Sequence, residues 1–140
     1  MTRIVIGYEP SFEQGARVTY VSEAHKAATI RLDEGLLVFP SQPNQDEVSN
    51  KGEGHCVSTS HTLSKEEDAL VTQLIESATL VLPPEEWWLD GVDWYIWIDR
   101  GLSSLQGHWG PRPPQGLIPL CRLLFELAGH TKAIHELDQP

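Results

Sequence analysis

The chain has 140 residues, of which 10 are basic and 20 are acidic, so its formal net charge at pH 7 is −10. Hydrophobic residues make up 40% and charged residues 21%, a globular composition that excludes collagen-like, disulfide-scaffold and wholly disordered chains. The length predicts a single domain over residues 1–140, and the acidic charge argues against nucleic acid or an anionic membrane as the partner, because both attract cationic surfaces.

The N-terminal segment has an apolar run at residues 4–6 only, whereas a signal peptide needs an apolar region of about 7–15 residues. No stretch approaches the roughly 18 apolar residues of a membrane span. Cys56 stands in a polar segment and Cys121 in an apolar one, which does not resemble a disulfide framework. We therefore expect a cytoplasmic protein.

Residues 3–39 contain short runs of β-branched and aromatic residues, interrupted by Gly, Pro, Asp and Ser. Such runs are typical of strands joined by tight turns, and they predict an antiparallel meander. Residues 9–11 and 33–35 are expected to be breaks between strands. The expected strands are residues 3–8, 17–21, 28–32 and 36–39.

Residues 40–62 contain Pro, Asn, Ser and Gly and almost no large apolar residue. This composition predicts a long loop or an insertion. Loops longer than about 12–15 residues are uncommon unless they are functional or disordered. We therefore keep two interpretations of residues 40–62 open, a functional loop and a flexible one.

Residues 64–78 are predicted to form an α-helix. Ser64 and Glu67 have the spacing of a capping box, in which each side chain accepts a hydrogen bond from the other residue's backbone N–H. Negative charge in the first turn is favoured by the helix dipole. Apolar residues recur at helical spacing, and the expected buried stripe is Leu70, Leu74, Ile75 and Ala78, widened by Val71.

Residues 85–109 are the most distinctive part of the chain. Asp90-Gly91 is a strong hairpin signal, and residues 92–98 that follow predict a strand. A second turn at residues 99–101 and a returning strand at 102–108 imply an antiparallel sheet. Alternation along the first strand places Trp94, Ile96 and Ile98 on one face and Tyr95 and Trp97 on the other.

The C-terminal part predicts a second helix. Apolar residues recur at helical spacing over residues 117–127, and Gly129 stands where a C-cap glycine is expected. Residues 130–140 are expected to be a frayed tail or a short helix. Together the segments predict an α+β domain: an antiparallel sheet, formed by the N-terminal meander and the C-terminal hairpins, with two helices packed on one face.

Candidate catalytic and metal-binding chemistry is concentrated at His55, Cys56 and His61. Structural zinc sites usually have paired ligand spacing, which is missing here, so we expect no metal and no cofactor. A Cys56–His61 dyad is conceivable, but no flanking signature accompanies it. No phosphate-binding glycine loop, nucleophile elbow or HExxH motif is present, and we expect that the chain is not an enzyme.

Aromatic and acidic residues coincide in one part of the chain. All five tryptophans lie between Trp87 and Trp109, and residues 63–110 hold nine acidic residues against two basic ones. This concentration is either a solvated acidic face or a binding surface for a basic protein. Tyr95 and Trp97 are either covered by the N-terminal meander or exposed for binding. The candidate partner-binding residues are Glu66, Glu67, Asp68, Glu85, Glu86, Asp90, Asp93, Tyr95 and Trp97.

The acidic helix, the hairpin at residues 89–94, the turn at residues 109–111 and the apolar helix at residues 117–129 together resemble a known class of protein. These are the small immunity proteins of bacterial polymorphic and contact-dependent toxin systems. The resemblance covers residues 63–129, and the first 62 residues match no pattern of the class. It implies an inhibitor that binds a toxin domain and blocks its active site, with no catalytic residue of its own.

Three hypotheses follow for the function. The first is a cytoplasmic immunity protein that occludes the cationic substrate site of a cognate toxin, such as a nuclease, with its acidic surface. The second is a non-inhibitory interaction module, such as an effector adaptor or a chaperone. The third is a small metal-dependent or Cys/His enzyme that uses His55, Cys56 and His61.

Overall fold

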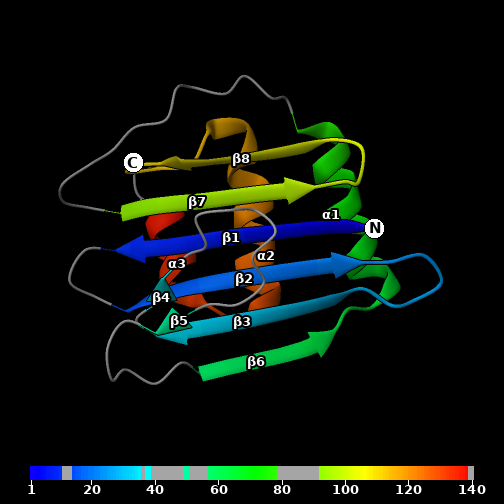
Figure 1. The fold of residues 1–140 in the computed structure, drawn as a ribbon, viewed down its shortest axis with the longest axis horizontal. Helices are drawn as coiled ribbons and strands as arrows, with labels where there is room; N and C mark the ends of the chain where they lie inside the picture. Colours follow the sequence, from blue (N-terminus) through cyan, green and yellow to red (C-terminus); the bar gives the residue numbers. More distant parts are fainter. Residues whose placement is uncertain (11–13, 36, 39–48, 51–56, 79–91, 139–140) are drawn as a thin grey trace.

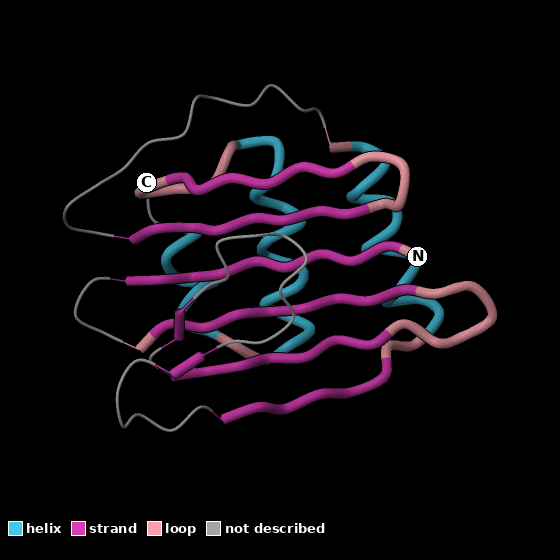
Figure 2. The backbone as a smooth tube through the Cα atoms, in the orientation of Figure 1, coloured by secondary structure: helices cyan, strands magenta, loops and turns pink. Residues whose placement is uncertain are grey.

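The computed structural model describes residues 1–10, 14–35, 37–38, 49–50, 57–78 and 92–138. Within them, six strands form one antiparallel sheet in the order β6-β3-β2-β1-β7-β8, and three helices lie on one face of it (Figure 1). The backbone trace in Figure 2 shows the same two layers, strands in front and helices behind. The α+β class and the antiparallel sheet predicted from the sequence are therefore confirmed.

The predicted meander forms the middle of the sheet as β1 (Thr2–Pro10), β2 (Gly15–Ser22) and β3 (Thr29–Gly35). These strands are longer than predicted. β1 runs on to Pro10, which lies opposite Val92 of β7. Residues 33–35, predicted to be a turn, continue β3, because the carboxylate of Asp33 is buried beside Arg17 of β2.

The prediction that all of residues 40–62 form a loop is wrong at its C-terminal end. Val57–Thr62 form β6, an edge strand that pairs antiparallel with β3. All six residues are exposed, so β6 has no buried face and no alternation of apolar residues to reveal it. Leu37–Val38 (β4) and Ser49–Asn50 (β5) form a separate two-stranded pair, and residues 40–48 and 51–56 lie outside the described residues.

The C-terminal strands are β7 (Val92–Asp99) and β8 (Ser104–Trp109); the turn between them covers residues 100–103, later than the predicted 99–101. The Asp99 carboxylate accepts a hydrogen bond of 2.9 Å from the N–H of Gly101, whose φ of 89° suits glycine. β7 also pairs along its whole length with β1, which joins the two halves of the chain in one sheet. The hairpin predicted at Asp90-Gly91 lies outside the described residues.

Helix α1 (Lys65–Ser77) begins with the predicted capping box. The Ser64 hydroxyl accepts a 3.1 Å hydrogen bond from the N–H of Glu67, whose carboxylate accepts one of 2.9 Å from the N–H of Ser64. The predicted buried stripe is rotated, because Val71 is fully buried whereas Leu70 is 51% exposed. Val71, Leu74, Ile75 and Ala78 follow the i, i+3, i+4, i+7 spacing, and Leu70 falls outside it.

Helix α2 (Ile118–Ala128) follows the 3-10 turn η1 (Gln115–Leu117) and ends at Gly129, whose φ of 81° confirms the predicted C-cap. The tail then forms a third helix, α3 (Thr131–Leu137), which is the second of the two expected alternatives. Its Ala133 and Leu137 side chains are buried in the core, so this short helix is held by tertiary packing.

The core lies between the helices and the facing side of the sheet, and Trp94 is at its centre. Its ring lies 5.1 Å from that of Tyr8 and 6.1 Å from that of Phe125, measured between centroids. Its Nε1–H donates a 3.0 Å hydrogen bond to the carbonyl of Pro111. Trp94 and Ile96 share one face of β7, as the alternation predicts, and are buried in one cluster with Leu124 of α2.

Replacing Trp94 should therefore weaken the fold strongly. We expect Trp94→Ala to lower the free energy of unfolding by about 3–5 kcal/mol, because it empties a large buried site. The control is Leu102→Ala, at a fully exposed position in the β7–β8 turn, which should change stability by about 0.5 kcal/mol at most. Urea denaturation measures both variants, and equal midpoints would contradict this assignment of the core.

His130 links stability to pH through the N-terminus of α3. Its Nδ1 accepts a 3.2 Å hydrogen bond from the N–H of Ala133, and its ring lies 5.6 Å from that of Phe125. Burial lowers the pKa of His130 below its usual 6.5, an effect that Glu34 opposes and Lys132 reinforces. The unfolded chain therefore binds this proton more readily than the folded chain does.

The resulting contribution to stability is complete above pH 6.5 and is lost as the pH falls toward the lowered pKa. We expect the urea midpoint to fall between pH 7.5 and 5. His130→Asn keeps an N-cap acceptor without the titration, so its midpoint should fall less over the same range. Parallel curves for the two proteins would show that His130 does not contribute.

Candidate functional site

The acidic first turn of α1 is the part of the predicted partner surface that the structure describes most fully. Glu67 closes the capping box with the backbone N–H of Ser64, and this hydrogen bond is the main cause that lowers the pKa of Glu67. Its carboxylate is therefore engaged in holding the helix terminus.

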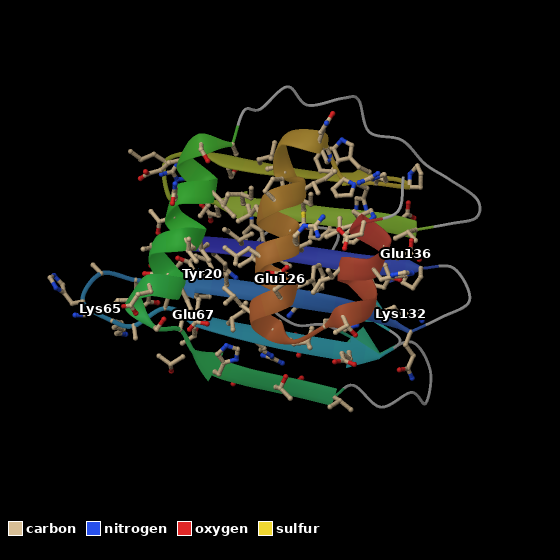
Figure 3. The ribbon with its side chains drawn as sticks, turned by 180° about the vertical axis from the view of Figure 1, so that it is seen from behind. Tyr20, Lys65, Glu67, Glu126, Lys132 and Glu136 are labelled. Carbon is tan, nitrogen blue, oxygen red and sulfur yellow. The ribbon has the colours of Figure 1, made fainter. Side chains whose placement is uncertain are left out.

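Asp68 is also engaged within the protein. Its Oδ1 accepts a hydrogen bond from the hydroxyl of Tyr20, which attaches α1 to β2 in the sheet below (Figure 3 labels Tyr20). Burial of Tyr20 and, next, its bond to Asp68 raise the pKa of the phenol to about 12. Two of the three predicted acidic residues in this turn thus have structural roles.

The outward side of α1 is free of such roles. We define the α1 outer face as the exposed residues Glu66, Ala69, Leu70, Gln73 and Glu76, which follow helical spacing. It carries the half-exposed Leu70 side chain, with the carboxylate of Glu66 about one turn before it and that of Glu76 nearly two turns after it. Of the predicted residues, Glu66 belongs to this face, and Glu76 is an addition that its exposure identifies.

Tyr95 and Trp97 do not form an exposed binding surface, which corrects the expectation that they contact a partner. They are 4% and 5% exposed and cluster with Val5 on the sheet face opposite the helices. The Arg3 guanidinium lies 5.2 Å from the centroid of the Trp97 ring. The Tyr95 ring lies 4.9 Å from that of His108. Both aromatic side chains therefore pack within the protein.

Asp93 is half-buried at the end of β7, directly opposite Glu9 of β1. Burial and, next, the negative charge of Glu9 raise the pKa of Asp93, while His108 lowers it. This arrangement separates Asp93 from the α1 outer face by the thickness of the sheet. The remaining predicted residues lie outside the described residues: Glu85, Glu86 and Asp90.

A charged network on the same sheet face was not anticipated from the sequence. Arg17 and Asp33 form a buried ion pair, with 3.5 Å between Nε and Oδ2. Arg31 donates a 2.9 Å hydrogen bond to the other carboxylate oxygen, which also accepts one from the hydroxyl of Ser58. The network links β2, β3 and the edge strand β6. In the sequence, only the alternation along these strands indicates that the charged side chains share one face.

The described part of the chain offers little metal or thiol chemistry. It contains no group of three His, Cys, Asp or Glu side chains placed to hold a metal ion. His61 is exposed on β6, while His55 and Cys56 lie outside the description. Cys121 is fully buried in α2, and burial raises its pKa to about 12, so its thiol stays protonated at neutral pH.

The contrasting roles of Asp68 and Glu66 generate a prediction. Asp68→Ala should lower the free energy of unfolding by about 1–3 kcal/mol more than Glu66→Ala, because it removes a hydrogen bond from a buried phenol. Both variants lose one first-turn carboxylate, so the effect on the helix dipole is matched. In a Tyr20→Phe background the difference should disappear. An undiminished difference would mean that Tyr20 is not the partner that matters.

Comparisons with known proteins do not assign a function to the α1 outer face. Among the described residues, none of the helices is both long enough and apolar enough to cross a bilayer. No family model, curated protein or solved structure matches this chain.

Proposed function

We propose that this chain is an immunity protein, which binds a cognate toxin domain in the cytoplasm and neutralises it by covering the toxin's active site. The observation that carries the proposal is the α1 outer face. It presents Glu66, Leu70 and Glu76 to solvent, on a helix whose remaining first-turn carboxylates are engaged in holding the fold.

The charge of the chain supports a basic partner. Residues 63–110 hold nine acidic residues against two basic ones, in a chain whose net charge is −10. Such a field accelerates association with a cationic protein and disfavours other acidic ones. A toxin that binds a polyanionic substrate, such as a nuclease, has a cationic active site of this kind.

The shape of the α1 outer face supports contact with a protein. An apolar side chain surrounded by charged groups is a common arrangement in interfaces, where the apolar contact is desolvated and the rim stays polar. Leu70 supplies the apolar contact, and Glu66 and Glu76 supply the rim. Replacing these three residues should leave the core intact, because none of them belongs to it.

The test expresses this chain in a bacterial host together with the product of the neighbouring gene, which the proposal expects to be the toxin. We expect the host to survive only when this chain is present, and the two proteins to form a one-to-one complex by size exclusion with light scattering. Glu66→Lys with Glu76→Lys should weaken the complex about tenfold, and raising the salt concentration should weaken the wild-type complex, because screening reduces the attraction.

The matched control is Glu126→Lys with Glu136→Lys, which changes the net charge equally but on α2 and α3. This control should bind within about threefold of the wild type, as charges outside the interface act only at long range. If the wild-type chain forms no complex and the host does not survive, the proposal is contradicted. A stable complex without survival would instead identify a non-inhibitory interaction module. Equal weakening by both double variants would exclude the α1 outer face as the contact.

A further inference from the structure

The last turn of α1 lies beside the β7–β8 turn (Figure 1), and a second surface feature is found between them. It is a half-open pocket of about 220 Å³ between three elements: the last turn of α1, the β7–β8 hairpin and the start of α2. Its lining is mainly apolar, from Ile75, Ala78, Ile98, Leu105, Leu117 and Leu120, with Arg100, Ser103 and Ser104 completing it.

The pocket is built from rigid parts of the fold. Leu117 and Leu120 are almost fully buried and belong to the main core, which fixes the floor. The β7–β8 turn is held by the 2.9 Å hydrogen bond from the N–H of Arg100 to the carbonyl of Ser103 and by the Asp99–Gly101 contact. The space is therefore preformed, which is the usual condition of small-ligand sites.

Arg100 gives the pocket its chemical character. Arg100 is exposed and is one of the residues that line the pocket, and no carboxylate within the described ranges forms an ion pair with its guanidinium. In a chain with 20 acidic and 10 basic residues, a guanidinium beside apolar walls is available to an external anion. Guanidinium groups bind carboxylates through paired, parallel hydrogen bonds.

We propose that this pocket binds a small carboxylic acid with an apolar group of about six to eight carbons. The apolar group occupies the space over Leu117 and Leu120, and the carboxylate pairs with Arg100 at the mouth. The size fits, because an apolar cavity of about 150 Å³ accommodates a benzene molecule. This site does not depend on the α1 outer face or on the proposed immunity function.

The experiment titrates the purified full chain with octanoate and records ¹H–¹⁵N spectra. We expect saturable shifts at the backbone amides of Ile75, Arg100 and Leu105, all of which line the pocket. Octanamide, which lacks the charge, and acetate, which lacks the chain, should each bind more weakly. Non-saturable shifts with octanoate, or shifts confined to other parts of the protein, would overturn the proposal.

Two variants separate the charge from the apolar contact. Arg100→Gln should weaken octanoate binding about threefold to tenfold and remove the preference over octanamide. Lys65→Gln, which removes an exposed cation at the opposite end of α1, is the matched control and should bind like the wild type. Equal affinity in the wild type and Arg100→Gln would show that Arg100 does not hold the carboxylate, and would overturn the proposal.

Ala78→Leu adds side-chain volume to the pocket and should weaken octanoate and octanamide alike. A thermal melt verifies that this variant is folded. If it does not fold, the site is still tested by the shifts of the wild-type protein and by Arg100→Gln, which leaves the apolar walls intact. Undiminished binding by a folded Ala78→Leu would place the ligand elsewhere and reject this pocket.

Discussion

Trp94 connects the parts of the molecule that the chain order separates. From β7 its ring packs against Tyr8 of β1 and Phe125 of α2, while its Nε1–H donates to the carbonyl of Pro111. The N-terminal meander, the C-terminal hairpin and the helical layer therefore meet at one indole. Because the ring is buried, its polar nitrogen needs this acceptor, and that requirement fixes how the segment before α2 leaves the sheet.

The two faces of the sheet are built on different principles. The face toward the helices is apolar and packs against α1, α2 and α3. The opposite face holds a buried Arg17–Asp33 ion pair beside a small aromatic cluster. Buried ion pairs contribute little net stability but are costly to break, so they favour one strand register over others. On this face, the described charged groups of Arg17, Arg31 and Asp33 thus act on the architecture.

Local patterns predicted the elements whose causes are local. The capping box at Ser64, the C-cap at Gly129 and the alternation along β7 each depend on a few neighbouring residues. The failures depend on distant contacts. β6 exists because β3 offers an edge, and its exposed residues carry no burial pattern. The rotation of α1 away from Leu70, the clustering of Tyr95 and Trp97 with Val5 of β1, and the bond between Asp68 and Tyr20 all depend on residues distant in the sequence.

The position of β1 has a consequence for synthesis of the chain on the ribosome. β1 is made long before β7, yet the two are neighbours in the middle of the sheet, and β7 begins only at Val92. At roughly 5–20 residues per second, on the order of 4–20 s pass before β7 can leave the ribosome. During that time the nascent meander can bury only one edge of β1, against β2. The other edge of β1 stays unpaired and can pair with strands of other chains. Protection by chaperones is therefore needed most before β7 is made.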